Sequence, residues 1–308
     1  MRFIALATDY DGTLADHGKV SKLMLKTLKN LKESGRKLIL VTGRELDDLK
    51  QVFPEHELFD RIVAENGALL YTPETREERL LTQKANPELV AQLKKRKVKP
   101  LFVGQAIVAT LEPHQIEAIE AIRTLGLELE VIFNKGAVMI LPSGVNKATG
   151  LQAALDELNI SPLNVVAVGD GENDHALLRH SACGAAVGDS IKSLKEKADL
   201  VLGGKGSSGV IELIERLLVD DLDRPDRTIS RHRVLLGRDD ENEKVRFNAC
   251  AASILVAGPS GSGKTTVTTA ILERVAEKGF QYCVFDPEGD YGNFPGSVQL
   301  GDHSHAPP

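Results

Sequence analysis

The chain has 308 residues, of which 42% are hydrophobic and 27% are charged, as in an ordinary globular protein with room for two domains. Its formal net charge of -6 excludes a strongly basic surface, and its aromatic content of 4% argues against stacking platforms, so no nucleic-acid partner is expected. Its apolar stretches are too short for a membrane span, and its three cysteines are dispersed, which predicts a cytoplasmic protein with no membrane partner.

Short apolar runs alternate with amphipathic segments in the first part of the chain. We expect strands at 3–7, 37–41 and 62–64, with helices at 23–31 and 45–53. Strands that alternate with helices indicate a parallel sheet with crossover connections. Ligands of such sheets bind at the carboxyl ends of the strands.

The pattern changes between residues 80 and 141. A helix is expected at 87–97 and another at 113–125, each followed by two extended runs. The last two runs are separated by Asn134-Lys135-Gly136, which is typical of a hairpin turn. This order predicts an α+β cap, with an antiparallel sheet and two helices on one face.

The α/β pattern resumes after the insert and continues to residue 219. Strands are expected at 164–168, 183–187 and 200–202, and helices at 146–158, 175–180, 191–197 and 210–218. The fold class predicted is therefore α/β, a Rossmann-like parallel sheet formed by residues 1–79 and 142–219, with the cap at 80–141 inserted into it.

Polar side chains collect where the expected strands end. The set consists of Asp9, Asp11, Thr42, Lys147, Asp170 and Asp174. Several carboxylates without a matching His or Cys favour a hard cation, and Mg²⁺ suits them best. A hydroxyl and a lysine nearby suit a phosphate, whose charge the lysine and the metal would neutralise. A carboxylate can act as the nucleophile, and a second acid can donate and accept the proton.

The motifs DYDGTL, VTGR, a later lysine and GDGENDHALL occur in this order over residues 1 to about 219. Together they resemble the haloacid dehalogenase superfamily of phosphatases. The position of the insert resembles the cap of the Cof-type, class IIB branch, and its small size is similar to that of the archaeal phosphoglycolate phosphatases.

The resemblance implies roles for individual residues. Asp9 would be the nucleophile and Asp11 the general acid and base. The phosphoryl group would be bound by Thr42, Gly43, Lys147 and Asn173. Magnesium would be held by Asp9, the backbone carbonyl of Asp11, Asp170 and Asp174.

The function expected is that of a Mg²⁺-dependent phosphatase. It would hydrolyse a small phosphorylated metabolite, such as a sugar phosphate or a phosphoglycolate-like ester, through an aspartyl-phosphate. Two alternatives stay open: a phosphotransferase or phosphomutase with the same core, and a nucleotide-regulated sensor module.

A charged, proline-containing run at 220–228 is interpreted as a linker, and residues 229–308 as a partial P-loop NTPase module. In this module we expect a hairpin at 229–236 and 244–247, strands at 253–257 and 283–285, and a helix from 264 to about 278. GPSGSGKT fits the phosphate-binding loop G-x-x-x-x-G-K-[ST]. The nucleotide-binding residues would be Gly258, Gly261, Gly263, Lys264, Thr265 and Thr266.

VLLGRD before this loop and VFDPEGDY after it resemble the HerA/FtsK/VirB4-type motor ATPases. The resemblance implies that ATP or another nucleoside triphosphate binds here. No later acidic pair that would polarise the attacking water is evident, so binding is expected but turnover is not. The module is therefore either part of a longer ATPase or degenerate.

Overall fold

The structure is a computed structural model that describes residues 1–223, 229, 232–249, 253–287, 289–291, 294 and 298. It divides into two compact units, Met1–Ile229 and Ser230–Pro308, which are described separately below. Residues 224–228, which make up most of the expected linker, lie outside the described residues. No helix in the described ranges is both long and apolar enough to cross a bilayer.

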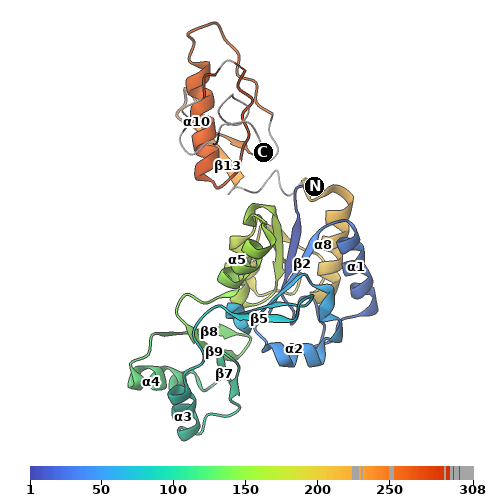
Figure 1. The fold of residues 1–308 in the computed structure, drawn as a ribbon, viewed down its shortest axis with the longest axis vertical. Coiled ribbons are helices and arrows are strands. Elements are labelled where there is room, and N and C mark those ends of the chain that lie inside the picture. Colours follow the sequence, from blue (N-terminus) through green and yellow to red (C-terminus); the bar gives the residue numbers. More distant parts are fainter. Residues whose placement is uncertain are drawn as a thin grey trace. The chain divides into compact units, whose positions relative to one another are not determined.

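An eight-stranded sheet in the order β12-β11-β10-β1-β2-β3-β4-β5 forms the centre of the first unit (Figure 1). The strands are β1 (Ala5–Thr8), β2 (Lys37–Val41), β3 (Arg61–Ala64), β4 (Leu69–Thr72), β5 (Glu77–Leu80), β10 (Val165–Gly169), β11 (Cys183–Ala186) and β12 (Leu200–Val201). From β12 to β3 the neighbouring strands run parallel, which confirms the predicted α/β fold.

The hairpin of β4 and β5 was not predicted, and it adds two antiparallel strands to one edge of the sheet. The side chains of β5 are largely exposed, and three of its four residues are charged. Charged residues commonly protect an edge strand from pairing with another chain. They also remove the alternation of apolar and polar residues by which a strand is predicted from sequence.

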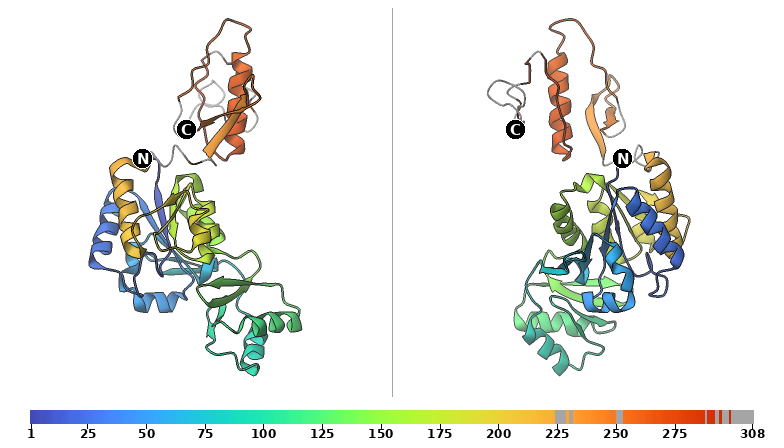
Figure 2. Two further views of the ribbon diagram at one scale, coloured as in Figure 1. Left: turned by 180° about the vertical axis from the view of Figure 1, so that it is seen from behind. Right: turned by 45° about the vertical axis from the view of Figure 1, so that its right-hand side comes forward.

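Helices cover both faces of this sheet (Figure 2). One face carries α1 (Lys22–Glu33), α2 (Leu46–Val52) and α8 (Gly206–Asp220); the other carries α5 (Lys147–Leu158) and α6 (His175–His180). A short helix, α7 (Lys192–Lys195), precedes β12. Side chains alternate along a strand. Leu38 and Leu40 of β2 therefore pack against α1, α2 and α8, and Ile39 and Val41 pack on the opposite face with α5 and α6.

The insert forms its own antiparallel sheet in the order β6-β7-β9-β8. Its strands are β6 (Phe102–Val103), β7 (Val108–Leu111), β8 (Leu129–Asn134) and β9 (Ala137–Pro142), and its helices are α3 (Pro87–Lys95) and α4 (Gln115–Leu125). Both helices pack on one face of the sheet, as expected. On its other face Met139 and Leu141 pack with Ala68 of the main unit, so this face meets the parallel sheet.

Within the described residues of the first unit, four short 3-10 helices lie in the connections: η1 (Pro54–Leu58), η2 (Glu65–Gly67), η3 (Pro162–Asn164) and η4 (Glu172–Asp174). Of these, η2 begins directly after β3, and η4 begins shortly after β10. Both therefore lie at the carboxyl edge of the parallel strands, where ligands of such sheets bind.

The second unit contains a hairpin of β13 (Arg233–Arg238) and β14 (Lys244–Asn248), and the helix α10 (Lys264–Glu277). The guanidinium of Arg274 donates to the carbonyl oxygens of Leu235 and Leu236, which ties α10 to β13.

The strands expected at 253–257 and 283–285 are wrong, because the structure forms neither. A strand needs a hydrogen-bonded neighbour, and among the described residues of this unit β13 and β14 pair only with each other. Apolar side chains in both segments therefore stay in solvent: Leu255 is 90% exposed and Phe285 is 92% exposed.

Candidate active site

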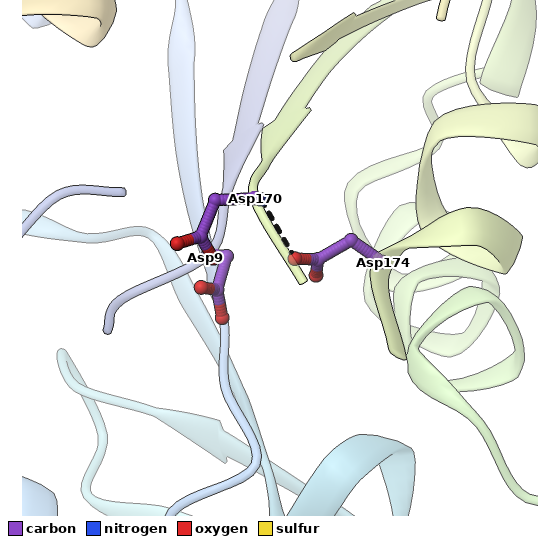
Figure 3. Close-up of side chains that lie close together, drawn as sticks. All are labelled: Asp9, Asp170 and Asp174. Atoms are coloured by element: carbon purple, nitrogen blue, oxygen red, sulfur yellow. Dashed lines mark hydrogen bonds between the residues drawn. The ribbon is translucent and has the colours of Figure 1, made fainter. Parts of the chain in front are cut away.

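Three buried carboxylates meet at the carboxyl edge of the parallel strands (Figure 3). One oxygen each of Asp9, Asp170 and Asp174 can be chosen so that all lie within 4.8 Å of one another. Asp9 follows β1 and Asp170 follows β10, and these strands are hydrogen-bonded neighbours. Asp174 ends η4 four residues further on. These three side chains are called the acidic cluster below.

Lys147 supplies a buried ammonium to this cluster. Its Nζ lies 2.5 Å from Asp9 Oδ1 and 2.6 Å from Asp174 Oδ1, and its side chain is 1% exposed. Lys147 is the first residue of α5, whose N-terminus is fixed by a capping box formed by Asn146 and Thr149. The helix start therefore sets the position of the charge.

Asp174 organises the loop that follows β10. Its Oδ2 accepts the backbone N–H groups of Asp170 and Gly171, each at 2.9 Å. The backbone approaches so closely that a Cβ on Gly169 would lie 2.5 Å from the Asp174 carboxyl carbon. Position 169 therefore requires glycine. The loop after β10 is held by its hydrogen bonds to the Asp174 carboxylate.

Burial dominates the electrostatics of the cluster. It raises the pKa of Asp9 to about 7 against the opposing effect of Lys147, while Asp174 and Asp170 raise it further. Burial also raises the pKa of Asp170, although Lys135 opposes this shift. For Lys147, burial alone would lower the pKa, but Asp174 and Asp9 outweigh it and hold the pKa above the ordinary value. Lys147 thus stays charged, and the carboxylates outnumber the buried cation.

Asp11 does not join the acidic cluster. The sequence grouped Asp11 with Asp9 at the end of the first strand, but β1 ends at Thr8 and the chain turns at Gly12, whose φ is +79°. The half-exposed Asp11 carboxylate is instead held by Arg44, with Nε and Nη2 each 2.7 Å from a carboxylate oxygen. Hydrogen bonds to Asp11 raise the pKa of Arg44, although burial opposes them.

The other residues predicted to bind phosphate lie at the same edge. Thr42 directly follows β2 and is buried, and its hydroxyl oxygen accepts the Arg44 backbone N–H at 3.1 Å. Gly43 borders Asn173, because a Cβ on Gly43 would lie 3.6 Å from Asn173 Nδ2. Asn173 precedes Asp174 in η4 and is 8% exposed.

Sequence reasoning missed two residues of η2. Asn66 Oδ1 accepts from Asn173 Nδ2 at 2.9 Å, and the Asn66 backbone N–H donates to the carbonyl of Thr42 at 2.9 Å. Glu65 is buried, and its carboxylate accepts three successive backbone N–H groups of the insert, from Gln105, Ala106 and Ile107. Both residues follow β3, so their place at a strand end could have indicated them.

A third missed residue comes from the insert. Lys135, in the turn between β8 and β9, places its ammonium on the Asp170 carboxylate. Nothing in the sequence of a hairpin turn signals such a contact, because it depends on how the insert packs on the parallel sheet.

The loop predicted to bind phosphate in the second unit lies directly before α10, which begins at Lys264. Gly261 and Gly263 have φ values of +78° and +85°, which suit glycine. Lys264 Nζ donates to the carbonyl of Pro259 at 3.0 Å, and Thr265 Oγ1 donates to Asp290 at 3.4 Å. A glycine-rich loop followed by a helix is thus present, although the expected strand before it is not.

Two family models match the chain. The haloacid dehalogenase-like hydrolase model matches residues 6–135 and 129–214, which is most of the first unit. The model of the central domain of helicase HerA matches residues 235–305, in agreement with the expected resemblance of the second unit to P-loop ATPases.

Curated relatives match the first part of the chain. A phosphoglycolate phosphatase of Methanopyrus kandleri is 29% identical over 221 residues, which cover 68% of this chain and 95% of the relative. The 5-amino-6-(5-phospho-D-ribitylamino)uracil phosphatase of Bacillus subtilis is 24% identical over 258 residues, covering 68% of this chain and 96% of the relative. The names of these relatives agree with the expectation of a phosphoric monoester hydrolase.

Solved structures show the same fold. A haloacid dehalogenase-like hydrolase from Bacteroides thetaiotaomicron superimposes with a TM-score of 0.59 at 21% identity, covering 70% of this chain and 99% of that one. A HAD/COF-like hydrolase from Plasmodium vivax gives a TM-score of 0.62 at 20% identity, covering 70% and 96%. With the family model matching more than half of its length, the chain belongs to the haloacid dehalogenase-like hydrolases.

Proposed function

We propose that the first unit is a Mg²⁺-dependent phosphatase that hydrolyses a small phosphorylated metabolite through an aspartyl-phosphate on Asp9. The observation that carries this proposal is the acidic cluster, with Lys147 bound to two of its three carboxylates. Membership of the hydrolase family and the phosphatase names of the relatives support it.

The donor set of the cluster fits a magnesium ion. When they are ionised, the three carboxylates carry more charge than the single buried ammonium of Lys147, and a divalent cation would neutralise the excess. The ligands would be Asp9, Asp170 and Asp174, together with the backbone carbonyl of Asp11. Bound there, the ion would supply positive charge to the phosphoryl oxygens as charge spreads over them in the transition state.

The protein's own residues would carry out the remaining steps. A carboxylate oxygen of Asp9 attacks the phosphorus, the ester bond breaks, and the leaving oxygen takes a proton from Asp11. Asp11 then takes a proton from water, which attacks the phosphorus and releases phosphate from Asp9. Lys147 holds Asp9 in place from its other side. Both proton transfers require the Asp11 side chain to rotate away from Arg44.

Phosphate release tests this function. The purified protein is incubated with sugar phosphates, phosphoglycolate and nucleotides, in Mg²⁺ and separately in EDTA. Release of phosphate in Mg²⁺ but not in EDTA supports the proposal, and equal release in both removes the metal from the mechanism. Release that requires an activating bisphosphate would favour a phosphomutase instead.

We also propose that the second unit binds a nucleoside triphosphate at residues 258–266. Backbone N–H groups of the loop would bind the phosphates, Lys264 would reach their outer oxygens, and Thr265 would hold Mg²⁺. The start of α10 at Lys264 and the match to the HerA central domain support this assignment. Calorimetry with ATP and Mg²⁺ tests it, since Lys264→Ala should weaken binding.

A further inference from the structure

The turn that carries Asp11 is closed on Ala15. Ala15 donates its backbone N–H to the Tyr10 carbonyl at 2.8 Å, and its own carbonyl accepts the Gly12 N–H at 3.0 Å. Tyr10 and Gly12 are the two neighbours of Asp11 in the chain, and Ala15 is buried. The backbone on both sides of Asp11 is therefore held by the residue that directly precedes Asp16.

Asp16 ties this turn to the start of α8. Its carboxylate accepts the Ser207 N–H at 3.2 Å and the Ser207 hydroxyl. Ser207 is the second residue of α8, so its N–H has no partner within that helix of 15 residues. A carboxylate at this end also interacts favourably with the helix dipole. These bonds join the Asp11 turn to a helix that packs on the central sheet.

Gly206 lets the helix approach the turn even more closely. Its φ is +46°, and a Cβ there would collide with Asp16 Oδ1 and lie 3.6 Å from the Gly12 carbonyl oxygen. A side chain at the start of α8 would thus touch the backbone beside Asp11. Position 206 therefore requires glycine.

A second carboxylate at the same helix end is not part of the Asp11 turn. Asp189 accepts the Gly206 N–H at 2.9 Å, but it lies in the connection between β11 and α7. Asp16 and Asp189 are both exposed, and each binds a backbone N–H of the first turn of α8. The two aspartates therefore serve the helix alike, and of the two only Asp16 connects it to Asp11.

We propose that Asp16 is a positioning residue for Asp11. The inference rests on the phosphatase function proposed above, in which Asp11 is the general acid and base. Arg44 holds the side chain of Asp11, and Asp16 holds the turn from which that side chain rotates. The reach of Asp11 toward the leaving oxygen depends on the place of this turn, and a misplacement of about 1 Å can cost roughly 100-fold in rate.

Leaving groups of different basicity separate this role from a purely structural one. An alkoxide leaves readily only when it is protonated, whereas p-nitrophenolate is stable without a proton. A misplaced general acid therefore slows an alkyl ester more than it slows p-nitrophenyl phosphate. The probes are 2-phosphoglycolate, phenyl phosphate and p-nitrophenyl phosphate, each in Mg²⁺. The ratio kcat/KM is compared, because it reports the transfer to the enzyme and not the later hydrolysis of the phosphoenzyme.

Four variants of the full-length chain are compared with the wild type. Asp16→Ala and Ser207→Ala break the link from its two sides, Asp16→Asn keeps one oxygen acceptor, and Asp189→Ala is the matched control. We expect the first two to lose about 10-fold or more in kcat/KM with 2-phosphoglycolate, less with phenyl phosphate and at most about 2-fold with p-nitrophenyl phosphate. Asp16→Asn should recover part of this loss, and Asp189→Ala should keep the wild-type ratios between the three esters.

The double variant Asp16→Ala, Ser207→Ala tests whether the two residues act as a pair. If they do, it should lose no more than either single variant. Losses that simply multiply would show that Asp16 acts through a different contact, which contradicts the inference.

Equal losses on all three esters would overturn the inference, because Asp16 would then only stabilise the fold. Unchanged ratios in Asp16→Ala, or the same shift of ratios in Asp189→Ala, would overturn it as well, while the phosphatase function stands. If Asp16→Ala does not fold, as judged by circular dichroism, the ratios of Asp16→Asn and Ser207→Ala decide. A wild type that cleaves none of the esters contradicts the phosphatase function itself, and the inference falls with it.

Discussion

The Asp9 carboxylate is buried, and the Lys147 ammonium binds one of its two oxygens. Lys147 holds Oδ1 at 2.5 Å, so Oδ2 is the oxygen that remains for the proposed attack on phosphorus or for the proposed metal. Asp174 anchors the same lysine and also accepts two backbone N–H groups of the loop after β10. Three residues from three separate segments therefore orient one another, and a change in any of them should affect the others.

Asp170 is the residue at which metal binding is most directly tested. Asp170→Ala removes one proposed metal ligand. Because a charged oxygen ligand is lost, we expect the Mg²⁺ affinity measured by calorimetry to fall by at least about 10-fold. Activity should fall with it and return only in part at high Mg²⁺. The control Asp47→Ala removes an exposed acid of α2 and should keep both values. Unchanged Mg²⁺ affinity in Asp170→Ala would remove this residue from the metal site.

At the scale of elements, η2 joins the parallel sheet to the cap. Glu65 and Asn66 have φ values of +50° and +55°, an unusual backbone for residues other than glycine. In this conformation the Glu65 carboxylate accepts three N–H groups from residues 105–107, and Asn66 bonds to Asn173 beside the acidic cluster. The short helix thus links the position of the cap to the position of η4, which carries Asn173 and Asp174.

Glu65→Ala tests this link. Three backbone donors lose a buried charged acceptor, so we expect the free energy of unfolding to fall by roughly 2 kcal/mol or more. Hydrogen exchange at the amides of Gln105, Ala106 and Ile107 should become faster. Glu78→Ala, which removes an exposed acid that bonds the Gln105 side chain, should change neither quantity much. Unchanged protection of the three amides in Glu65→Ala would contradict the link.

The elements that sequence could predict are those with a strong local signal. The strand at 37–41 has the predicted bounds, because an unbroken apolar run defines it, and the helix predicted to begin at His175 does begin there. β5 was missed because its charged side chains carry no such period. The strands at 253–257 and 283–285 were predicted from apolar runs alone, and an apolar run forms a strand only where a neighbouring strand pairs with it.

The same distinction applies to the site. Residues that end strands of one parallel sheet could be grouped from sequence, since the carboxyl ends of such strands share an edge. Asp9, Thr42 and Asp170 follow this rule. The pairing of Asp11 with Arg44 and the contact of Lys135 with Asp170 could not be predicted. One depends on the turn at Gly12 and the other on how two separately folded sheets pack, and neither is a local property.

At the scale of the whole molecule, the chain contains two compact units. The first has a continuous core that extends past α8 to Leu222 and Ile229, which are 1% and 4% exposed. In addition, Asp221 pairs with Arg36 at 2.9 Å. We propose that the phosphatase is complete within this unit and acts independently of the phosphate loop.

A chain ending after Ile229 tests that independence. We expect it to be folded and to release phosphate from a non-nucleotide substrate at the full-length rate, because the cut keeps every core residue named above. Lys264→Ala in the full chain should weaken ATP binding and leave phosphate release unchanged. A folded but inactive truncated protein, or a Lys264→Ala protein with reduced phosphate release, would instead show that the second unit regulates the first.

In the proposed mechanism, Asp9 forms the covalent intermediate. Acid quenching during turnover, followed by proteolysis and mass spectrometry, measures it directly. We expect the peptide containing Asp9 to gain the mass of one phosphoryl group with the site at that residue, and Asp9→Asn to show neither the adduct nor turnover, because a carboxamide cannot form an acyl phosphate. Turnover by Asp9→Asn at the wild-type rate, or a phosphoryl group on a different residue, would contradict the claim.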